Sequence, residues 1–330
     1  MAELPLVVLT NPTFPETRAS FEGVARVSCN EGLEPWSHDE IAERCRYAAG
    51  IMAFMTDCID RAFLERCPNL KVIGAALKGY DNIDVEAASE RGVWVTIVPD
   101  LLTEPTAELA VGLTIALGRH IRLGDAAIRQ AGFHGWRAEH YGNGLNSATV
   151  GIVGFGKVGQ TIARCLSGFG CRIVAFDEHG GARGTAGVAM VALKELLAQS
   201  DVVILGLPLT AETTGIIGRD AINGMKPGAL LVNPARGSLV DEKAIADALE
   251  AGHLGGYAAD VFECEDWARA DRPRGVDPRL LAPGARTLLT PHIGSAVTSV
   301  RRQIEMAAAT SIREALAGAV PSGAINKPRI

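Results

Sequence analysis

The sequence predicts an α/β fold with two doubly wound parallel sheets, each covered by helices. Short aliphatic runs alternate with helical segments along the whole chain, and this alternation is typical of such sheets. The chain has 330 residues, 48% of them hydrophobic and 21% charged, which is typical of a globular protein. At about 100 to 200 residues per domain, this length indicates two domains.

The first hundred residues contain enough candidate strands for one small sheet. These short β-branched or aliphatic runs cover residues 6–10, 25–28, 51–55, 72–75 and 93–97. A helix is expected next, over 103–121. Leu109, Leu113 and Leu117 follow helical spacing there, after a proline well placed for a first turn. We interpret this helix as a connection between domains.

A second and larger sheet is predicted further along the chain. Its candidate strands cover residues 149–153, 172–176, 202–205, 229–232, 256–259 and 287–289. A last helix, over 300–316, comes too late to serve this sheet alone, so we expect the chain to return to the first domain. The predicted domains are therefore residues 1–100 with 297–330, and residues 101–296.

Charge and composition exclude several classes of protein. The 32 basic residues are scattered among 38 acidic ones and the net charge is −6, so no nucleic-acid partner is expected. The seven cysteines form no C-x-x-C motif and indicate reduced thiols. No signal-peptide pattern is present, and no apolar run approaches the ~20 residues that span a bilayer. We expect a cytoplasmic protein without a membrane partner, and we predict no metal site.

The strongest motif reads Gly154-Phe155-Gly156-Lys157-Val158-Gly159 and stands between a predicted strand and a predicted helix. In a dinucleotide site the first glycine permits a tight turn, the second brings backbone close to the pyrophosphate, and the third lets helix pack on strand. Asp177 ends the next strand region, where a carboxylate binds the adenosine ribose and repels a 2′-phosphate. NAD is therefore predicted over NADP, although Arg183 weakens this preference. The alternative is a glycine-rich turn without a ligand.

Three polar segments follow the last three predicted strands, where doubly wound sheets bind their ligands. Arg236 supplies a fixed cation for an anionic substrate, Glu265 a carboxylate, and His292 an imidazole that can move a proton near neutral pH. Ser295 is placed to hold the imidazole or a water molecule. Each residue alone could be structural, in a surface salt bridge or a core. The preceding dinucleotide motif favours the functional interpretation of the three together.

The glycine motif, followed by the segments that contain Arg236, Glu265 and His292, resembles in sequence and in order the motifs of the D-2-hydroxyacid dehydrogenases. The resemblance implies a Rossmann-type nucleotide domain inserted into a flavodoxin-like substrate domain, a cleft between them, and a homodimer built on the nucleotide domain. It implies catalytic roles for Arg236, Glu265 and His292, and a contact between Asp260 and the nicotinamide carboxamide. The further residues that it places at the cofactor are Leu207, Pro208, Leu209, His292 and Ser295.

Other segments resemble the phosphite (phosphonate) dehydrogenases within that family, and they cover residues 52–55, 76–82, 98–102, 255–263 and 265–273. Lys78, beside Gly79, adds a full positive charge where most relatives offer backbone N–H groups and a small side chain. A doubly charged oxyanion such as phosphite would benefit most from Lys78 and Arg236 together. Lys78 could instead be a solvent-facing loop lysine. The resemblance also implies that Met55, Trp136 and Tyr141 line the substrate site, although the two aromatic residues could instead pack in a dimerisation arm.

We therefore expect NAD-dependent oxidation of phosphite to phosphate by hydride transfer. His292, oriented by Glu265, would take the proton from water. The first alternative is reduction of a 2-keto acid, such as hydroxypyruvate or glyoxylate, with His292 as the proton donor. The second alternative is an NAD-sensing co-repressor that binds a protein partner through the same fold.

Overall fold

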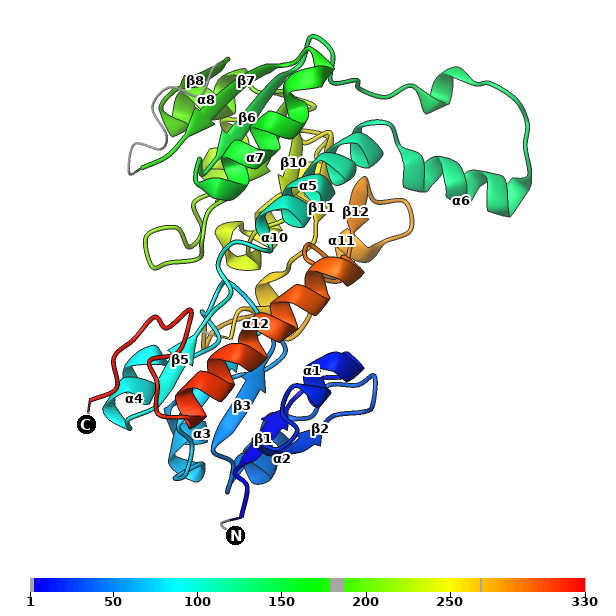
Figure 1. The fold of residues 1–330 in the computed structure, drawn as a ribbon. Helices are drawn as coiled ribbons and strands as arrows, with labels where there is room; N and C mark the ends of the chain where they lie inside the picture. Colours follow the sequence, from blue (N-terminus) through cyan, green and yellow to red (C-terminus); the bar gives the residue numbers. More distant parts are fainter. Residues whose placement is uncertain (1–2, 179–186, 268, 330) are drawn as a thin grey trace. The chain divides into compact units, whose positions relative to one another are not determined.

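The computed structural model describes residues 3–178, 187–267 and 269–329, and Arg183 lies outside these residues. The chain divides into two compact units (Figure 1). Unit 1 comprises Met1–Leu102, Trp267–Ala270 and Ala296–Ile330, and unit 2 comprises Thr103–Asp266 and Asp271–Ser295. Both units contain a parallel sheet between helices, so the predicted α/β class is confirmed.

Unit 1 contains a five-stranded parallel sheet of order β2-β1-β3-β4-β5, which is the flavodoxin-like order. Its strands are β1 (Leu6–Leu9), β2 (Arg26–Cys29), β3 (Gly50–Ala53), β4 (Val72–Ala75) and β5 (Trp94–Thr96). Its helices are α1 (Pro15–Ala19), α2 (His38–Cys45), α3 (Arg61–Arg66), α4 (Val85–Glu90) and α12 (Thr298–Leu316). The central strands β3 and β4 are buried throughout, as continuous apolar runs in parallel sheets usually are.

The two faces of this sheet are covered by different helices. Ile41 of α2, Phe63 of α3 and Ala87 of α4 belong to one buried cluster, whereas Ile304 and Ile312 of α12 belong to another. A Cβ at position 74 of β4 would lie only 2.5 Å from Cγ1 of Ile312, so glycine permits the close approach of α12. The chain thus returns to unit 1 after the second sheet.

Unit 2 contains a seven-stranded parallel sheet of order β12-β11-β10-β9-β6-β7-β8. Its strands are β6 (Thr149–Val153), β7 (Arg172–Phe176), β8 (Val188–Met190), β9 (Val202–Leu205), β10 (Leu230–Asn233), β11 (Gly256–Ala259) and β12 (Thr287–Leu289). The order reverses between β9 and β6, which creates the switch point at which doubly wound folds bind ligands. The sequence did not predict β8, because this edge strand has only three residues and two of them are exposed.

The helices of unit 2 correct one prediction. They are α5 (Thr103–Gly118), α6 (Ile121–Ala131), α7 (Lys157–Leu166), α8 (Leu193–Gln199), α9 (Arg219–Asn223), α10 (Glu242–Glu250) and α11 (Pro278–Leu281). The helix predicted over 103–121 ends at Gly118, because His120 has a φ of 54°, and a second helix begins at Ile121. The buried residues of α5, such as Leu113 and Leu117, belong to a core of unit 2, and α5 is the first element of that unit.

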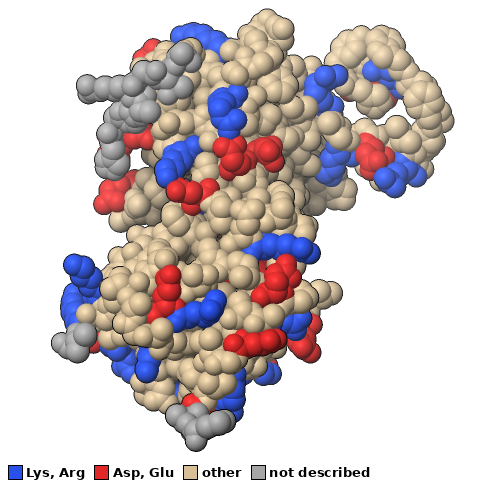
Figure 2. All heavy atoms as spheres, in the orientation of Figure 1, with Lys and Arg blue, Asp and Glu red and all other residues tan. Residues whose placement is uncertain are grey.

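The described surface carries charges of both signs. Figure 2 shows Lys and Arg side chains interspersed with Asp and Glu on the viewed face of each unit. Among the described residues, no helix is long and apolar enough to cross a membrane.

Candidate active site

The glycine loop joins β6 to α7, and its three glycines meet different surroundings. Gly154 has a φ of 96°, and a Cβ there would lie 2.8 Å from the carbonyl carbon of Gly206. Gly159 is buried, and a Cβ there would lie 3.2 Å from Cγ2 of Ile152. Gly156 is exposed, and apart from its chain neighbours no described atom lies within 4 Å of its would-be Cβ. The open side of this loop at the start of α7 therefore fits a pyrophosphate.

Asp177 is fixed beside this loop. It follows β7, and its Oδ2 accepts a hydrogen bond from the backbone N of Phe155 at 2.8 Å. The carboxylate thus lies next to the glycine turn, as ribose recognition requires.

The two helical residues of the glycine motif differ in burial. Lys157 is exposed, whereas Val158 packs partly against the core.

The segment after β9 adjoins the same loop. A Cβ on Gly154 would lie 2.8 Å from the backbone N of Leu207. Leu207 and Leu209 pack partly against the core of unit 2, and the carbonyl oxygen of Pro208 accepts a hydrogen bond from the Thr213 hydroxyl at 2.7 Å. These residues therefore lie at the switch point, where the resemblance expects the cofactor.

Arg236 follows β10 in a tightly folded loop. Nδ2 of the buried Asn233 donates to the carbonyl oxygen of Arg236 at 2.8 Å, and Oδ1 of Asn233 accepts from the backbone N of Ala235 at 3.1 Å. The half-buried Arg236 side chain donates from Nη1 to the carbonyl oxygen of Ala235 at 2.9 Å. Since β10, β11 and β12 are neighbours, the Arg236 loop and the two other predicted polar segments share one edge of the sheet.

His292 and Glu265 form the predicted pair. Nδ1 of His292 lies 2.8 Å from Oε2 of Glu265, and both side chains are 27% exposed. The other carboxylate oxygen of Glu265 accepts from the backbone N of Phe262 at 2.8 Å. Because the carboxylate is anchored and occupies Nδ1, proton exchange with a substrate is left to Nε2 of His292.

Asp260 organises the loop that carries His292. Asp260 is 1% exposed, and its carboxylate accepts hydrogen bonds from the Thr290 hydroxyl at 2.6 Å and from the backbone N of Ile293 and Gly294 at 2.8 and 2.7 Å. Burial raises the pKa of Asp260, and these hydrogen bonds oppose that shift. They hold His292 in an unusual left-handed conformation, with a φ of 55°. The predicted nicotinamide contact of Asp260 stays a prediction, as does the role of the half-buried Ser295 just beyond Gly294.

Sequence reasoning missed three acidic residues that join these loops. Oδ2 of the buried Asp266 accepts from the backbone N of Ser238 at 2.5 Å, which ties the Glu265 segment to the Arg236 loop. Glu242 and Glu263 each accept a hydrogen bond from the other's backbone N, at 2.8 and 2.9 Å. Burial raises the pKa of Glu242 to about 7. No sequence pattern distinguishes these carboxylates from exposed ones, because their partners lie at least 21 residues away.

In unit 1, the predicted substrate residues lie on loops after two neighbouring strands. Met55 follows β3, and Lys78 and Gly79 follow β4; all three are half-buried. The strand predicted over 51–55 ends at Ala53, because the backbone N of Phe54 donates to Oδ2 of Asp57 at 2.8 Å. The structure thus brings Met55, Lys78 and Gly79 to one edge of the five-stranded sheet.

A buried polar network, also missed by sequence reasoning, supports these loops. Asp57 is 1% exposed, and its Oδ2 also accepts from the Thr10 hydroxyl at 2.5 Å. Nδ2 of Asn82 donates to the carbonyl oxygens of Phe54 and Asp57, at 3.1 and 2.7 Å. Burial raises the pKa of Asp57 to about 6. The segments that follow β1, β3 and β4 are thereby linked.

Trp136 and Tyr141 lie in the exposed segment after α6. The side chains are 80% and 64% exposed, and their ring centroids are 5.7 Å apart. Their predicted place at a substrate site therefore stays a prediction.

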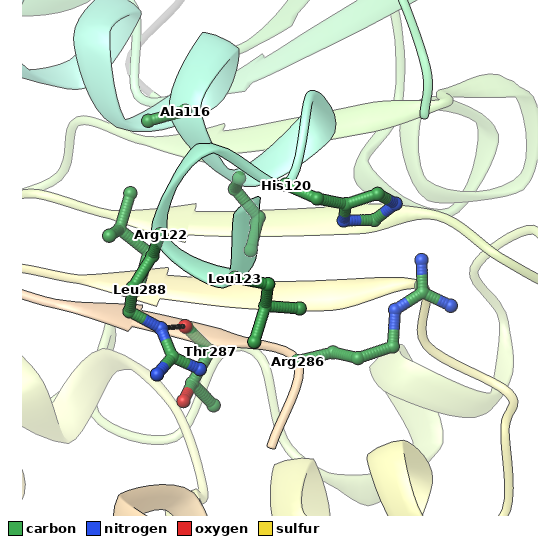
Figure 3. A pocket seen from close by; sticks show the side chains of 9 residues that line it. Ala116, His120, Arg122, Leu123, Arg286, Thr287 and Leu288 are labelled. Carbon is green, nitrogen blue, oxygen red and sulfur yellow. Dashed lines mark hydrogen bonds between the residues drawn. The ribbon is translucent and has the colours of Figure 1, made fainter. Parts of the chain in front are cut away.

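A pocket of unit 2 lies at the amino ends of β11 and β12 (Figure 3). Arg122 crosses it and donates to the carbonyl oxygens of Thr287 and Ala285 at 2.9 and 2.7 Å. Figure 3 shows the His120 ring and the Arg286 side chain on one side of it. The pocket is separate from the candidate active site, because ligands of doubly wound sheets bind at the carboxyl ends of the strands.

Comparisons with known proteins find a matching family, related sequences and a similar solved structure. The family described as D-isomer specific 2-hydroxyacid dehydrogenase, NAD binding domain, matches residues 111–294. A glyoxylate reductase of Thermococcus litoralis is 36% identical, with 87% of this chain and 86% of that protein covered. A D-3-phosphoglycerate dehydrogenase of Mycobacterium tuberculosis is 33% identical over 98% of this chain, which spans 59% of that longer protein. The crystal structure of the TT0316 protein from Thermus thermophilus is similar with a TM-score of 0.87, at 34% identity, with 97% of this chain and 100% of that one covered.

Proposed function

The chain belongs to the D-isomer specific 2-hydroxyacid dehydrogenase family, and on that premise we propose that it oxidises phosphite to phosphate. It is an NAD-dependent oxidoreductase of that family. The observation that carries the choice of phosphite is Lys78, a half-buried lysine on the loop after β4. Phosphite is a compact doubly charged oxyanion, and Lys78 with Arg236 would offer it one point-like and one forked cation.

We further propose that residues 1–100 with 297–330, which all belong to unit 1, form the substrate domain, and that residues 101–296, most of which belong to unit 2, form the nucleotide domain. Gly154, Gly156 and the start of α7 would hold the pyrophosphate, and Asp177 the adenosine ribose. Leu207 to Leu209 and Asp260 would border the nicotinamide. When bound there, NAD supplies the hydride acceptor.

His292 is the proposed proton acceptor. Phosphite, NAD⁺ and water would give phosphate, NADH and one proton: the P–H bond breaks with loss of hydride, and the oxygen of water bonds to phosphorus. His292 would take the water proton at Nε2, because Glu265 lies at Nδ1. Lys78 and Arg236 would hold the anion in place, and such positioning can supply several kcal/mol of a barrier.

The second candidate is reduction of a 2-keto acid such as glyoxylate or hydroxypyruvate. The comparisons favour this candidate, because a relative named glyoxylate reductase covers most of the chain. Arg236 would then bind the substrate carboxylate, and His292 would donate the proton to the keto oxygen. In this reaction Lys78 would have no necessary role.

We also propose that the protein is a homodimer. Helix α6 contains no buried residue, and its apolar Ile121 and Ile128 are 53% and 54% exposed. Phe133 and Trp136, which follow it, are each 80% exposed. Such a patch is costly in water unless a second chain covers it. Replacing Ile128 and Phe133 by serine should convert a dimer into a monomer in analytical ultracentrifugation, and a wild-type monomer would contradict the proposal.

The deciding measurement is NADH formation, followed by near-ultraviolet absorbance. Purified protein and NAD⁺ are mixed with phosphite, glycerate or lactate in parallel, and glyoxylate is tested with NADH. We expect rapid turnover with phosphite alone. Turnover only with the hydroxy or keto acids would establish the second candidate. NADH-dependent partner binding without turnover would instead favour a sensor protein.

A further inference from the structure

Three side chains of different chemistry gather in unit 1, outside the residues assigned above. Ligand atoms of His38, Cys58 and Asp60 lie within 4.8 Å of one another. His38 is the first residue of α2, Asp60 immediately precedes α3, and Cys58 lies in the loop after β3. Among the described residues this is the one cluster in which at least three His, Cys, Asp or Glu side chains could share a metal ion.

The His38 ring carries the clearest sign of a missing ligand. Its Nε2 is shielded from solvent, and among the described residues it has no hydrogen-bond partner. The nearest oxygen of Asp60, Oδ1, is 3.7 Å away, which is too long for a hydrogen bond. A buried polar atom without a partner requires an explanation, and an ion is one of the usual ones.

The distance between the ligand atoms of His38 and Asp60 fits a shared metal better than a direct contact. With bonds of about 2.0–2.2 Å to zinc in tetrahedral geometry, ligand nitrogen and oxygen atoms are about 3.4 Å apart. The observed 3.7 Å between Nε2 of His38 and Oδ1 of Asp60 is close to that value. An imidazole, a thiolate and a carboxylate together are also the ligand types that zinc accepts.

Neighbouring contacts hold two of these side chains in orientation. Oδ1 of Asp60 accepts a hydrogen bond from the backbone N of Phe63 at 2.8 Å and thereby caps α3. The Phe63 ring packs against the His38 ring, with their centroids 6.0 Å apart. Such outer contacts are what orient ligands in protein metal sites.

We propose that His38, Cys58 and Asp60 form a binding site for zinc, with a fourth position occupied by water. The Asp60 side chain is 50% exposed, so metal and water can reach the site from its side. Three protein ligands with one open position are typical of zinc sites that are not purely structural. This proposal does not depend on the identity of the substrate.

The position of the three ligands in the chain predicts how zinc would affect stability. Cys58 and Asp60 belong to the loop that also carries Met55 and the buried Asp57, and His38 begins another helix. Zinc would therefore join the starts of α2 and α3 to this loop. Since the unfolded chain lacks the assembled site, zinc should raise the melting temperature.

The test uses the full-length protein and cobalt as a visible substitute for zinc. One equivalent of Co²⁺ should bind, give a thiolate-to-cobalt charge-transfer band in the near ultraviolet, and be displaced by Zn²⁺. Cys58→Ser should abolish the band and weaken zinc binding at least about a hundredfold, since even outer contacts of metal ligands are worth 10- to 100-fold. Asp60→Asn, which retains a helix-capping side chain, should weaken zinc binding at least about tenfold.

Cys29→Ser is the matched control, because Cys29 is another half-buried thiol of unit 1. It should leave the cobalt band and the zinc affinity unchanged. Far-ultraviolet circular dichroism of each metal-free variant checks that it folds. The proposal is overturned if Co²⁺ gives no thiolate band, if the band survives Cys58→Ser, or if Cys264→Ser removes it instead.

Discussion

The carboxyl edges of the two sheets are built differently. In unit 2 the polar side chains Asp260, Glu265 and Asp266 each accept a hydrogen bond from backbone of the same edge. In unit 1 the buried Asp57 also accepts a hydrogen bond from backbone. The predicted substrate residues of unit 1, Lys78 and Met55, instead lie half-buried on loops. The family match over 111–294 coincides almost entirely with unit 2.

This difference suggests a division of labour. A reaction that moves a hydride and a proton needs groups held in fixed geometry, which the backbone-anchored carboxylates of unit 2 can provide. In the proposed function, the choice among small anions depends on one loop side chain of unit 1, Lys78. Four substitutions test this comparison.

The largest effect is expected from His292→Phe in unit 2. Loss of the proposed proton acceptor should lower kcat/KM by about a thousandfold or more, at the upper part of the range for general acid–base catalysis. The Kd for NADH, measured by fluorescence, should stay within about twofold. Glu265→Gln should cause a smaller loss, because the amide can still hold the ring. Retained turnover in His292→Phe would remove this residue from the mechanism.

Asp57→Asn tests the buried support in unit 1 through its pH dependence. The pKa of Asp57 is raised from 3.8 to about 6 in the folded state, so the folded chain binds more protons between these values. Stability should therefore fall as pH rises from about 4 to about 6, by on the order of 3 kcal/mol relative to Asp57→Asn. Urea unfolding of both proteins across this range measures the difference. The exposed Asp39→Asn should show the wild-type trend, and parallel curves for wild type and Asp57→Asn would contradict the assignment.

Lys78→Ala tests whether unit 1 selects the substrate. Removal of one charged contact worth about 2 kcal/mol should raise KM for phosphite by roughly thirtyfold, with a smaller change in kcat. Lys71→Ala is the control, because Lys71 is exposed and precedes β4 at the opposite end of the strand. If both variants leave KM unchanged, Lys78 does not bind the substrate.

The smallest effect is expected from Asp177→Ala at the cofactor loop of unit 2. The preference for NAD over NADP, as the ratio of kcat/KM values, should fall by about tenfold, because a ribose contact and a repulsive charge are both lost. Glu178→Ala, the exposed neighbour, should leave the ratio unchanged. A ratio unaffected by Asp177→Ala would show that another residue binds the ribose.

Local sequence predicted the interior of the sheets well. Strands β6, β7 and β9 have the predicted bounds, because buried parallel strands are continuous apolar runs that can be recognised without their neighbours. The edge strand β8 was missed, and the helix over 103–121 was predicted without its break. The left-handed conformation of His120 that separates α5 from α6 has no marker in the local sequence.

The sequence by itself determined the α/β class, the glycine loop with Asp177, and the order of Arg236, Glu265 and His292 after successive strands. These features are local, since each depends on a strand and the residues that follow it. Only the tertiary structure decided which of the 38 acidic residues became buried supports. Asp57 meets Thr10 across 47 positions and Asp266 meets Ser238 across 28. A carboxylate's burial depends on partners that the fold brings from elsewhere in the chain, and such pairing leaves no periodic trace in the sequence.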